Sequence, residues 1–268
     1  MAGKPPRNSF RIQLGGWLSD FAVTMTCWAY FTLGFVLLFS VGYCVAYLFS
    51  PQREISFQRL TNLFFRGFLG IVRTAAPRHH WQIDKRIAET KSSVIICNHL
   101  SYLDPLLMIS LFKRQKTIVK TKFFKVPILG WVIRNAGYCP ADSNGKFARM
   151  MIDQIEQMEG YLAGGGNLFV FPEGTRSRDG KIAPLNRGAL KIARLCRAPV
   201  YVLHLCNTEK LFTPGKFLFN TRIKNTISLT IVDRIEPDSG QGLSLTELES
   251  RISQALMMLP AESEGRTI

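Results

Sequence analysis

The stretch SSVIICNHLSYLDPLLMISLF, residues 92–112, changes its pattern halfway along. Its first part is a short apolar run with β-branched residues, which predicts a buried strand over residues 92–98. Its last part starts at Pro105, a residue favoured in the first turn of a helix, and stays apolar to Phe112. His99 follows the strand, and Asp104 precedes the proline, where it suits a helix N-cap. The stretch therefore predicts a strand–loop–helix unit with an imidazole and a carboxylate on its loop.

The same alternation continues towards the C-terminus. Short apolar runs predict strands at 117–119, near 138, and at 167–172, 199–205 and 226–235, and periodic segments predict helices at 127–135, 146–162, 186–196 and 243–260. Ser244 and Glu247 have the spacing of a capping box at the start of the last helix. Strands that alternate with helices predict an α/β fold, with a mixed, largely parallel sheet flanked by helices.

The N-terminal part has a different composition. Residues 21–49 contain no charged side chain, and a helix of that length would be about 43 Å long, more than the hydrocarbon core of a bilayer. This segment predicts a membrane helix, either a tilted span or a re-entrant hairpin bent at Gly34 and Gly42. We expect residues 1–75 to be membrane-anchoring helices and residues 76–268 to be an α/β domain.

Basic residues add a second membrane signal. The formal net charge is +15, which favours an acidic partner such as nucleic acid, an anionic membrane surface or a phosphorylated small molecule. Arg59, Arg66 and Arg73 are seven residues apart, so they line one edge of a predicted amphipathic helix. That pattern is typical of a helix lying at a membrane interface. The alternative is a core helix with a solvated basic edge.

Two polar loops are the candidate sites. A carboxylate that accepts a hydrogen bond from one imidazole nitrogen leaves the other nitrogen available as a general base, so His99 and Asp104 are candidate catalytic residues. The stretch FVFPEGTRSRDG, residues 169–180, presents Glu173, Gly174, Thr175 and Arg176 after another predicted strand. Arginine suits phosphate, and glycine allows a ligand to approach the backbone. Structural roles for both loops are the alternative.

Other site types are not supported by the sequence. The six cysteines form no C-x-x-C pair, so neither a zinc site nor a disulfide framework is predicted. A serine hydrolase lacks its G-x-S-x-G elbow, and Ser101 is too close to His99 along the chain to be a good nucleophile. No nucleic-acid-binding signature is present. We expect His79 and His80 to lie at the lipid interface and His204 to be a core histidine.

The two polar blocks resemble those of the glycerolipid acyltransferases, a family that includes 1-acylglycerol-3-phosphate acyltransferases. NHLSYLD, residues 98–104, is similar to the family's N-H-x-x-x-x-D block, and FPEGTRSR, residues 171–178, is similar to its F-P-E-G-T-R-S block. The resemblance implies transfer of a fatty acyl group from an acyl-CoA or acyl-carrier-protein thioester to a lysolipid hydroxyl, without a cofactor or metal. The implied product is phosphatidate, made from 1-acylglycerol-3-phosphate.

The resemblance also implies roles for the residues. His99 would deprotonate the acceptor hydroxyl, Asp104 would orient His99, and the block that runs from Glu173 through Gly174 and Thr175 to Arg176 would hold the glycerol and phosphate of the acceptor. Backbone amides near the motif would stabilise the oxyanion. The implied partners are membrane lipids, the lysolipid and the thioester donor, and the implied location is a bacterial inner membrane with the catalytic domain on the cytoplasmic side.

The chain departs from the family pattern at one block. Family members that use lysophosphatidate commonly carry an arginine a few residues after the glycine matched by Gly137, whereas GYCPADS, residues 137–143, ends in serine. Lys120, Lys122 or Arg178 is a candidate replacement, and Lys122 is our choice for the substrate-binding set. The alternatives are a different acceptor, such as a lyso-ornithine lipid, or an inactive membrane scaffold.

Overall fold

The centre of the protein is a seven-stranded sheet. The computed structural model describes residues 7–141, 147–177, 182–237 and 244–257, with side chains described from residue 16 onward. The strand order is β1-β7-β6-β2-β5-β3-β4, and all neighbours are parallel except β6 and β7. The strands are β1 (His79–Ile83), β2 (Ser93–Cys97), β3 (Gln115–Val119), β4 (Cys139–Pro140), β5 (Asn167–Val170), β6 (Val200–Cys206) and β7 (Asn225–Ile235). The predicted mixed, largely parallel α/β fold is confirmed.

Strand β2 lies at the middle of the sheet, where both of its faces are covered. Val94 and Ile96 face one hydrophobic cluster, and Ile95 and Cys97 face the other, because successive side chains of a strand point to opposite faces. The first cluster contains residues of α9 (Met158–Ala163), α10 (Arg187–Leu195) and α12 (Leu245–Met257). Burial on both sides explains the unbroken apolar run of this strand.

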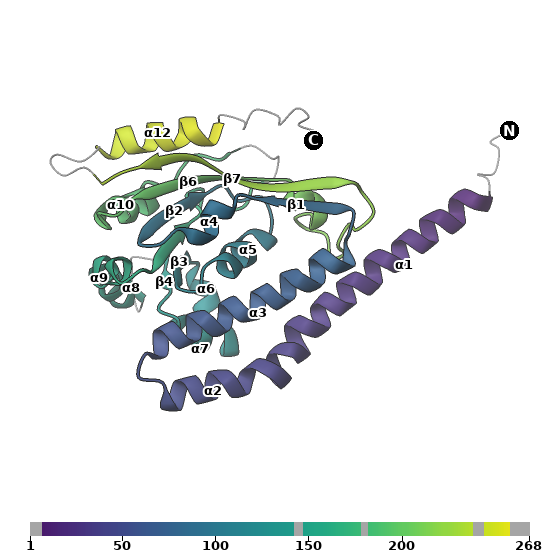
Figure 1. Ribbon diagram of the computed structural model, residues 1–268, viewed down its shortest axis with the longest axis horizontal. Helices are drawn as coiled ribbons and strands as arrows, with labels where there is room; N and C mark the ends of the chain where they lie inside the picture. Colours follow the sequence, from purple (N-terminus) through teal and green to yellow (C-terminus); the bar gives the residue numbers. More distant parts are fainter. Residues whose placement is uncertain (1–6, 142–146, 178–181, 238–243, 258–268) are drawn as a thin grey trace.

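The second cluster lies between the sheet and the N-terminal helices. It includes residues of α3 (Arg53–Ala75) and α5 (Leu103–Leu111) together with residues of β2, β5 and β6. Figure 1 shows α5 and α3 on the side of the sheet away from α12, with α1 and α2 outside them. Residues 53–75 therefore pack into the same core as the sheet, although they precede the boundary expected at residue 75. The remaining short helices are α4 (Lys85–Glu89), α6 (Thr121–Phe124), α7 (Pro127–Asn135), α8 (Ala148–Glu156) and α11 (Thr208–Leu211).

The uncharged N-terminal segment is helical throughout. It belongs to a longer helical stretch of α1 (Arg7–Ala29), a π-helical section η1 (Tyr30–Phe39) and α2 (Ser40–Phe49), in which Gly16–Phe49 is long and apolar enough to cross a membrane. The chain does not reverse at Gly34 or Gly42, as a re-entrant hairpin would require. It reverses after α2, and α3 runs back along α2 and α1 (Figure 1). Several large apolar side chains are exposed on this segment, including Leu33, Leu37, Leu38, Val41, Leu48 and Phe49.

A buried carboxylate connects α1 to the loop that follows α11. Asp20 is 4% exposed and accepts hydrogen bonds from the backbone N–H and the hydroxyl of Thr221, at 2.9 and 2.7 Å, while Arg222 Nε donates to its other oxygen at 2.9 Å. Earlier in the same loop, the rings of Phe219 and Phe212 stack with centroids 4.6 Å apart. The long helix is therefore attached to this loop by charge-assisted hydrogen bonds, which are stronger than neutral ones.

Three local expectations had different outcomes. The capping box is confirmed, since Glu247 accepts from the Ser244 N–H and the Ser244 hydroxyl accepts from the Glu247 N–H. The helix expected over 146–162 is divided into α8 and α9, of which only α9 has buried residues. The lipid-interface placement of His79 is wrong, because His79 is buried in the edge strand β1, where its ring contacts the Asn220 carbonyl and the Asn225 amide.

Candidate active site

The side chain of Asn98 fixes the point where the chain leaves β2. Its amide nitrogen donates to the Leu205 carbonyl of the neighbouring strand β6 at 2.8 Å, and its oxygen accepts from the Leu205 N–H at 2.7 Å. A buried asparagine that makes both bonds holds the two strand ends together. The next residue, His99, is thus placed at the carboxyl edge of the sheet, where α/β folds commonly bind their ligands.

His99 and Asp104 form a hydrogen-bonded pair. Nδ1 of His99 is 2.9 Å from Oδ2 of Asp104, and the two side chains are 15% and 0% exposed. An ionised carboxylate only accepts hydrogen bonds, so Nδ1 carries the proton and donates it. Nε2 is then the basic nitrogen of the neutral ring, and within the described residues no protein group is recorded as bonded to it. The arrangement is that of an oriented general base.

Asp104 is held by three further donors. Its Oδ2 accepts from the N–H groups of Leu100 and Ser101 at 2.5 and 2.7 Å, and its Oδ1 accepts from the hydroxyl of Thr208 at 2.6 Å. The expected N-cap role is wrong. Helix α5 begins at Leu103, two residues before the expected start at Pro105, and the Asp104 carboxylate turns back to the loop amides. This contact shapes the loop and orients His99 at the same time.

The second motif loop is bonded directly to the first. Glu173 is buried, and its Oε1 accepts from the His99 N–H at 2.8 Å while its Oε2 accepts from the Ala183 N–H at 3.1 Å. The Ser177 N–H donates to the His99 carbonyl at 2.8 Å. Burial raises the pKa of Glu173, and the two amide donors act in the opposite direction. Both carboxylate oxygens already accept protein N–H groups, and contact of Glu173 with an acceptor stays a prediction.

Arg176 lies over the loop that carries His99. Its guanidinium carbon is 3.4 Å from the centroid of the Tyr102 ring, a cation–π contact. One guanidinium nitrogen, Nη1, is buried, and no acceptor for it is found in the described part of the chain. A buried donor without a partner is costly, so this nitrogen suits an anionic ligand. Gly174 and Thr175 are exposed just before it, and Gly174 has a φ of +65°, a conformation that favours glycine.

Aromatic contacts complete the wall beside the histidine. The Phe171 ring stacks on the His99 ring, with centroids 4.4 Å apart and an angle of 24°. The hydroxyl of Ser101 donates to the Phe212 carbonyl at 2.9 Å, so it is engaged away from the imidazole. Ser101 therefore lacks the hydrogen bond to His99 that a nucleophilic serine needs.

The remaining candidate residues lie at the same edge of the sheet or outside the described part. Lys120 and Lys122 are exposed after β3, which is separated from β2 by β5. The ammonium nitrogen of Lys122 lies 5.2 Å from the centroid of the Phe123 ring, and its role at the site stays a prediction. Ser143 and Arg178 fall outside the described residues.

Sequence reasoning missed Thr208, Tyr102 and Phe171 as neighbours of the motif residues. Thr208 is 104 residues from Asp104 and belongs to no motif, and only the pairing of β6 with β2 brings the two together. Tyr102 and Phe171 lie within or beside the quoted blocks, so their position in the sequence was a usable signal. Asn98 is also part of the first block, and its role depends on the strand pairing.

Comparison with known proteins supports the assignment of these blocks. The family model described as Acyltransferase matches residues 78–205. A chloroplastic 1-acyl-sn-glycerol-3-phosphate acyltransferase from Brassica napus is 34% identical over 122 residues, which are 46% of this chain and 35% of that protein. The enzyme of the same name from Saccharomyces cerevisiae is 31% identical over 134 residues, 48% of this chain and 44% of that protein. The chain thus spans less than half the length of these relatives.

The fold has a counterpart among solved structures. The crystal structure of the 1-acyl-sn-glycerophosphate acyltransferase PlsC from Thermotoga maritima matches with a TM-score of 0.66 at 19% identity, covering 89% of this chain and 94% of that one. At this identity the match establishes the fold alone. The sequence match covers the segment that carries His99, Asp104 and Arg176. Over residues 78–205 the chain is therefore similar to the acyltransferase family.

Proposed function

We propose that this protein is a glycerolipid acyltransferase that moves a fatty acyl group from a thioester to the free hydroxyl of a lysolipid. The observation that carries the proposal is the pair formed by His99 and Asp104, 2.9 Å apart, with a partly exposed imidazole beside a fully buried carboxylate. The family match over residues 78–205 supports the same reaction class. No covalent enzyme intermediate and no metal is part of the proposed reaction.

In the proposed reaction, His99 acts first as a base and then as an acid. As the acceptor oxygen attacks the thioester carbonyl carbon, Nε2 takes the hydroxyl proton, and Asp104 stabilises the imidazolium that forms. Collapse of the tetrahedral intermediate breaks the carbon–sulfur bond, and the imidazolium returns the proton to the departing thiolate. The products are a new ester and a free thiol.

We propose 1-acylglycerol-3-phosphate as the acceptor, and phosphatidate as the product. Support comes from Arg176, whose buried Nη1 has no acceptor among the described residues and is held in place by the Tyr102 ring. An arginine suits a phosphate because its planar group offers several donors to the phosphate oxygens. A lyso-ornithine lipid lacks that phosphate and offers a carboxylate instead, which has fewer acceptor oxygens for the guanidinium.

An acceptor panel tests the proposal. The full chain in detergent is assayed with lysophosphatidate, lysophosphatidylcholine and lyso-ornithine lipid, each with an acyl-CoA and an acyl-carrier-protein donor. We expect transfer to lysophosphatidate to be fastest and to disappear in His99→Ala. Faster transfer to lyso-ornithine lipid than to lysophosphatidate would identify lyso-ornithine lipid as the acceptor instead. Absence of transfer with every pair would leave a membrane scaffold as the better description.

We also propose that the protein is bound to a membrane through the helix Gly16–Phe49. Its exposed apolar residues would face lipid, and an aspartate near the centre of a membrane helix costs about 2.5–3.5 kcal/mol. The double variant Leu37→Asp and Leu38→Asp should therefore be extracted from membranes by alkaline carbonate. Leu195→Asp, at an exposed leucine of α10, is the matched control and should remain in the pellet. Equal behaviour of both variants would place the anchor elsewhere.

A further inference from the structure

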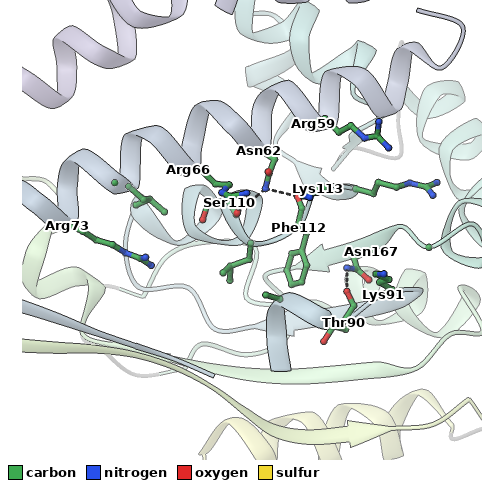
Figure 2. Close-up of a pocket in the computed structure, with 16 residues that line it drawn as sticks. Arg59, Asn62, Arg66, Arg73, Thr90, Lys91, Ser110, Phe112, Lys113 and Asn167 are labelled. Carbon is green, nitrogen blue, oxygen red and sulfur yellow. Dashed lines mark hydrogen bonds between the residues drawn. The ribbon is translucent and has the colours of Figure 1, made fainter. Parts of the chain in front are cut away.

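A large basic cavity lies at the edge of the sheet opposite His99. Its volume is about 730 Å³, within the range of small-molecule sites. Its walls come from α3, from the ends of α4 and α5, and from the chain just before β2, β3 and β5. Figure 2 shows the side chains of α3 reaching from one wall towards the segments that precede the strands. The cavity therefore lies at the amino edge of the sheet.

Six cations line this cavity, which we call the amino-edge pocket. Arg59, Arg66 and Arg73 come from α3 and span 14 residues, so their row is about 21 Å long. Lys91 precedes β2, and Lys113 and Arg114 precede β3 on the other side of the pocket. The basic edge predicted for α3 is thus one wall of a pocket whose other cations come from distant parts of the sequence.

The charge of the pocket is not neutralised by the described part of the protein. None of the six cations forms an ion pair with a described carboxylate, and no aspartate or glutamate is among the described lining residues. Nε of Arg114 is buried, and it has no acceptor in the described ranges. Burial also lowers the pKa of Arg73. Cations gathered in this way stabilise a bound anion.

Asn62 weakens a feature of the pocket that would oppose an anion. The carbonyls at the end of a helix carry partial negative charge, and α5 ends at this pocket. The buried Asn62 amide donates to the carbonyls of Ile109, Ser110 and Phe112 at 2.8, 2.9 and 3.0 Å. These carbonyls are thereby satisfied, and the polar surface left to a ligand consists mainly of donors.

The pocket is separate from the proposed active site but close to the apolar helices. The five residues of β2 lie between the two, a distance of about 16 Å through the sheet. On its outer side, α3 packs directly on the N-terminal helices, where Tyr30 stacks on Phe64 with centroids 5.1 Å apart. Packed helix axes are about 8–10 Å apart, so α3, which forms one wall of the pocket, lies one helix layer from the apolar N-terminal helices.

We infer that the amino-edge pocket binds the phosphate headgroup of an anionic phospholipid that is neither substrate nor product. This inference uses the proposed membrane location but not the proposed reaction. Headgroup phosphates are the anions present at the boundary between the apolar helices and water, which is where the pocket lies. A row of cations about 21 Å long is larger than one phosphate group, so the site accommodates a headgroup with its glycerol.

Binding of a short-chain lipid to the full chain tests the inference. The probe is dihexanoyl phosphatidylglycerol, titrated into protein held in a neutral detergent, with dihexanoyl phosphatidylcholine, inorganic phosphate and coenzyme A as comparison ligands. The pocket variant is Arg66→Gln with Lys113→Gln. The matched control, Lys191→Gln with Arg194→Gln, removes one lysine and one arginine that are exposed on α10, on the other face of the sheet.

We expect tighter binding of phosphatidylglycerol than of phosphatidylcholine or free phosphate. The pocket variant should bind phosphatidylglycerol about 25-fold more weakly, which is fivefold for each basic residue removed. The α10 variant should lose less than about twofold in the same affinity. Equal losses in both variants would show a diffuse charge effect and overturn the site. Binding of inorganic phosphate as tight as that of phosphatidylglycerol would overturn the lipid assignment. Binding of coenzyme A that is lost in the pocket variant would overturn it as well. His99→Ala should bind the probe normally, so failure of the proposed reaction is distinguishable from failure of this site.

Discussion

The two edges of the sheet hold their charges in opposite ways. At the carboxyl edge, His99 is paired with Asp104, and Glu173 accepts two backbone amides. At the amino edge, six cations line a pocket without a described acidic partner. A charge that is paired inside the protein has a fixed position, which proton transfer requires. A charge that is left unpaired attracts a ligand from solution or membrane.

Arg176 is the exception that links the two patterns. It belongs to the carboxyl edge, but its contact is with a ring rather than a carboxylate, and Nη1 has no described acceptor. The carboxyl edge thus contains a fixed hydrogen-bonded pair and one cation with an open donor. The comparison predicts that mutations of the pair change the rate, and that mutations of the open cation change ligand affinity.

The largest effect is expected for the fixed pair. His99→Ala removes the general base and should lower kcat by about 10²–10⁴-fold, because general acid–base catalysis contributes about that much. His80→Ala, at an exposed histidine of β1, is the control and should retain activity. Single-turnover assays with lysophosphatidate measure the effect. Full activity of His99→Ala would show that the catalytic site is not at the carboxyl edge of the sheet.

Arg176→Ala should act mainly on the acceptor. A hydrogen bond to a charged group contributes about 1.5–3 kcal/mol, so KM for lysophosphatidate should rise about 10–100-fold with little change in KM for the thioester. Steady-state kinetics with each substrate varied in turn measures both values. Arg194→Ala on α10 controls for the loss of a positive charge. A rise only in KM for the thioester would indicate that Arg176 binds the acyl donor instead.

Thr208→Val tests the pair through a fully buried residue that contacts Asp104. Loss of the 2.6 Å bond to Asp104 should cost about 1–2 kcal/mol, or about 5–30-fold in kcat. The carboxylate then becomes more basic and favours the imidazolium, so the acid limb of the pH–rate profile should move to higher pH. Thr208→Ser keeps the donor and should restore both properties. A lower kcat with an unmoved profile would indicate a structural role only.

The smallest effect concerns a histidine with no carboxylate partner. Burial lowers the pKa of His79, and its two ring nitrogens contact the Asn220 carbonyl and the Asn225 amide. As pH falls, the His79 imidazole is therefore protonated in the unfolded chain before it is protonated in the folded protein. Below about pH 6.5 this difference lowers the free energy of unfolding, by at most about 1.4 kcal/mol per pH unit. Urea unfolding of the wild type and His79→Gln between about pH 7.5 and 5.5 should show a weaker pH dependence in the variant. An identical pH dependence would contradict this.

Much of the fold could be predicted from local patterns. The run 92–98 and the segment 127–135 correspond to β2 and α7 because their apolar residues follow the period of the element they form. Strand β1 was missed because its residues, HHWQI, are polar or aromatic apart from Ile83, and because the strand lies at the edge of the sheet. Its position depends on pairing with β7, which is about 150 residues away in the chain.

The site was predictable only where its parts are near in sequence. His99 and Asp104 are five residues apart, so one loop brings them together, and the structure places them within hydrogen-bonding distance. The contact of Glu173 with the His99 N–H required the parallel pairing of β2 with β5. Lys91 and Arg114 reach the amino-edge pocket through the same sheet topology. Sequence spacing contains no information on such contacts.

The attachment of α1 to the loop after α11 has a mechanical consequence. Asp20 holds Thr221 and Arg222, Phe219 and Phe212 stack, and the Phe212 carbonyl accepts from Ser101, whose N–H contacts Asp104. A short series of rigid contacts thus connects the long apolar helix to the imidazole. For the proposed membrane-bound enzyme, tilting of that helix in a bilayer of different thickness would change the height of His99 above the lipid surface, and with it the depth at which the acceptor hydroxyl can reach the imidazole.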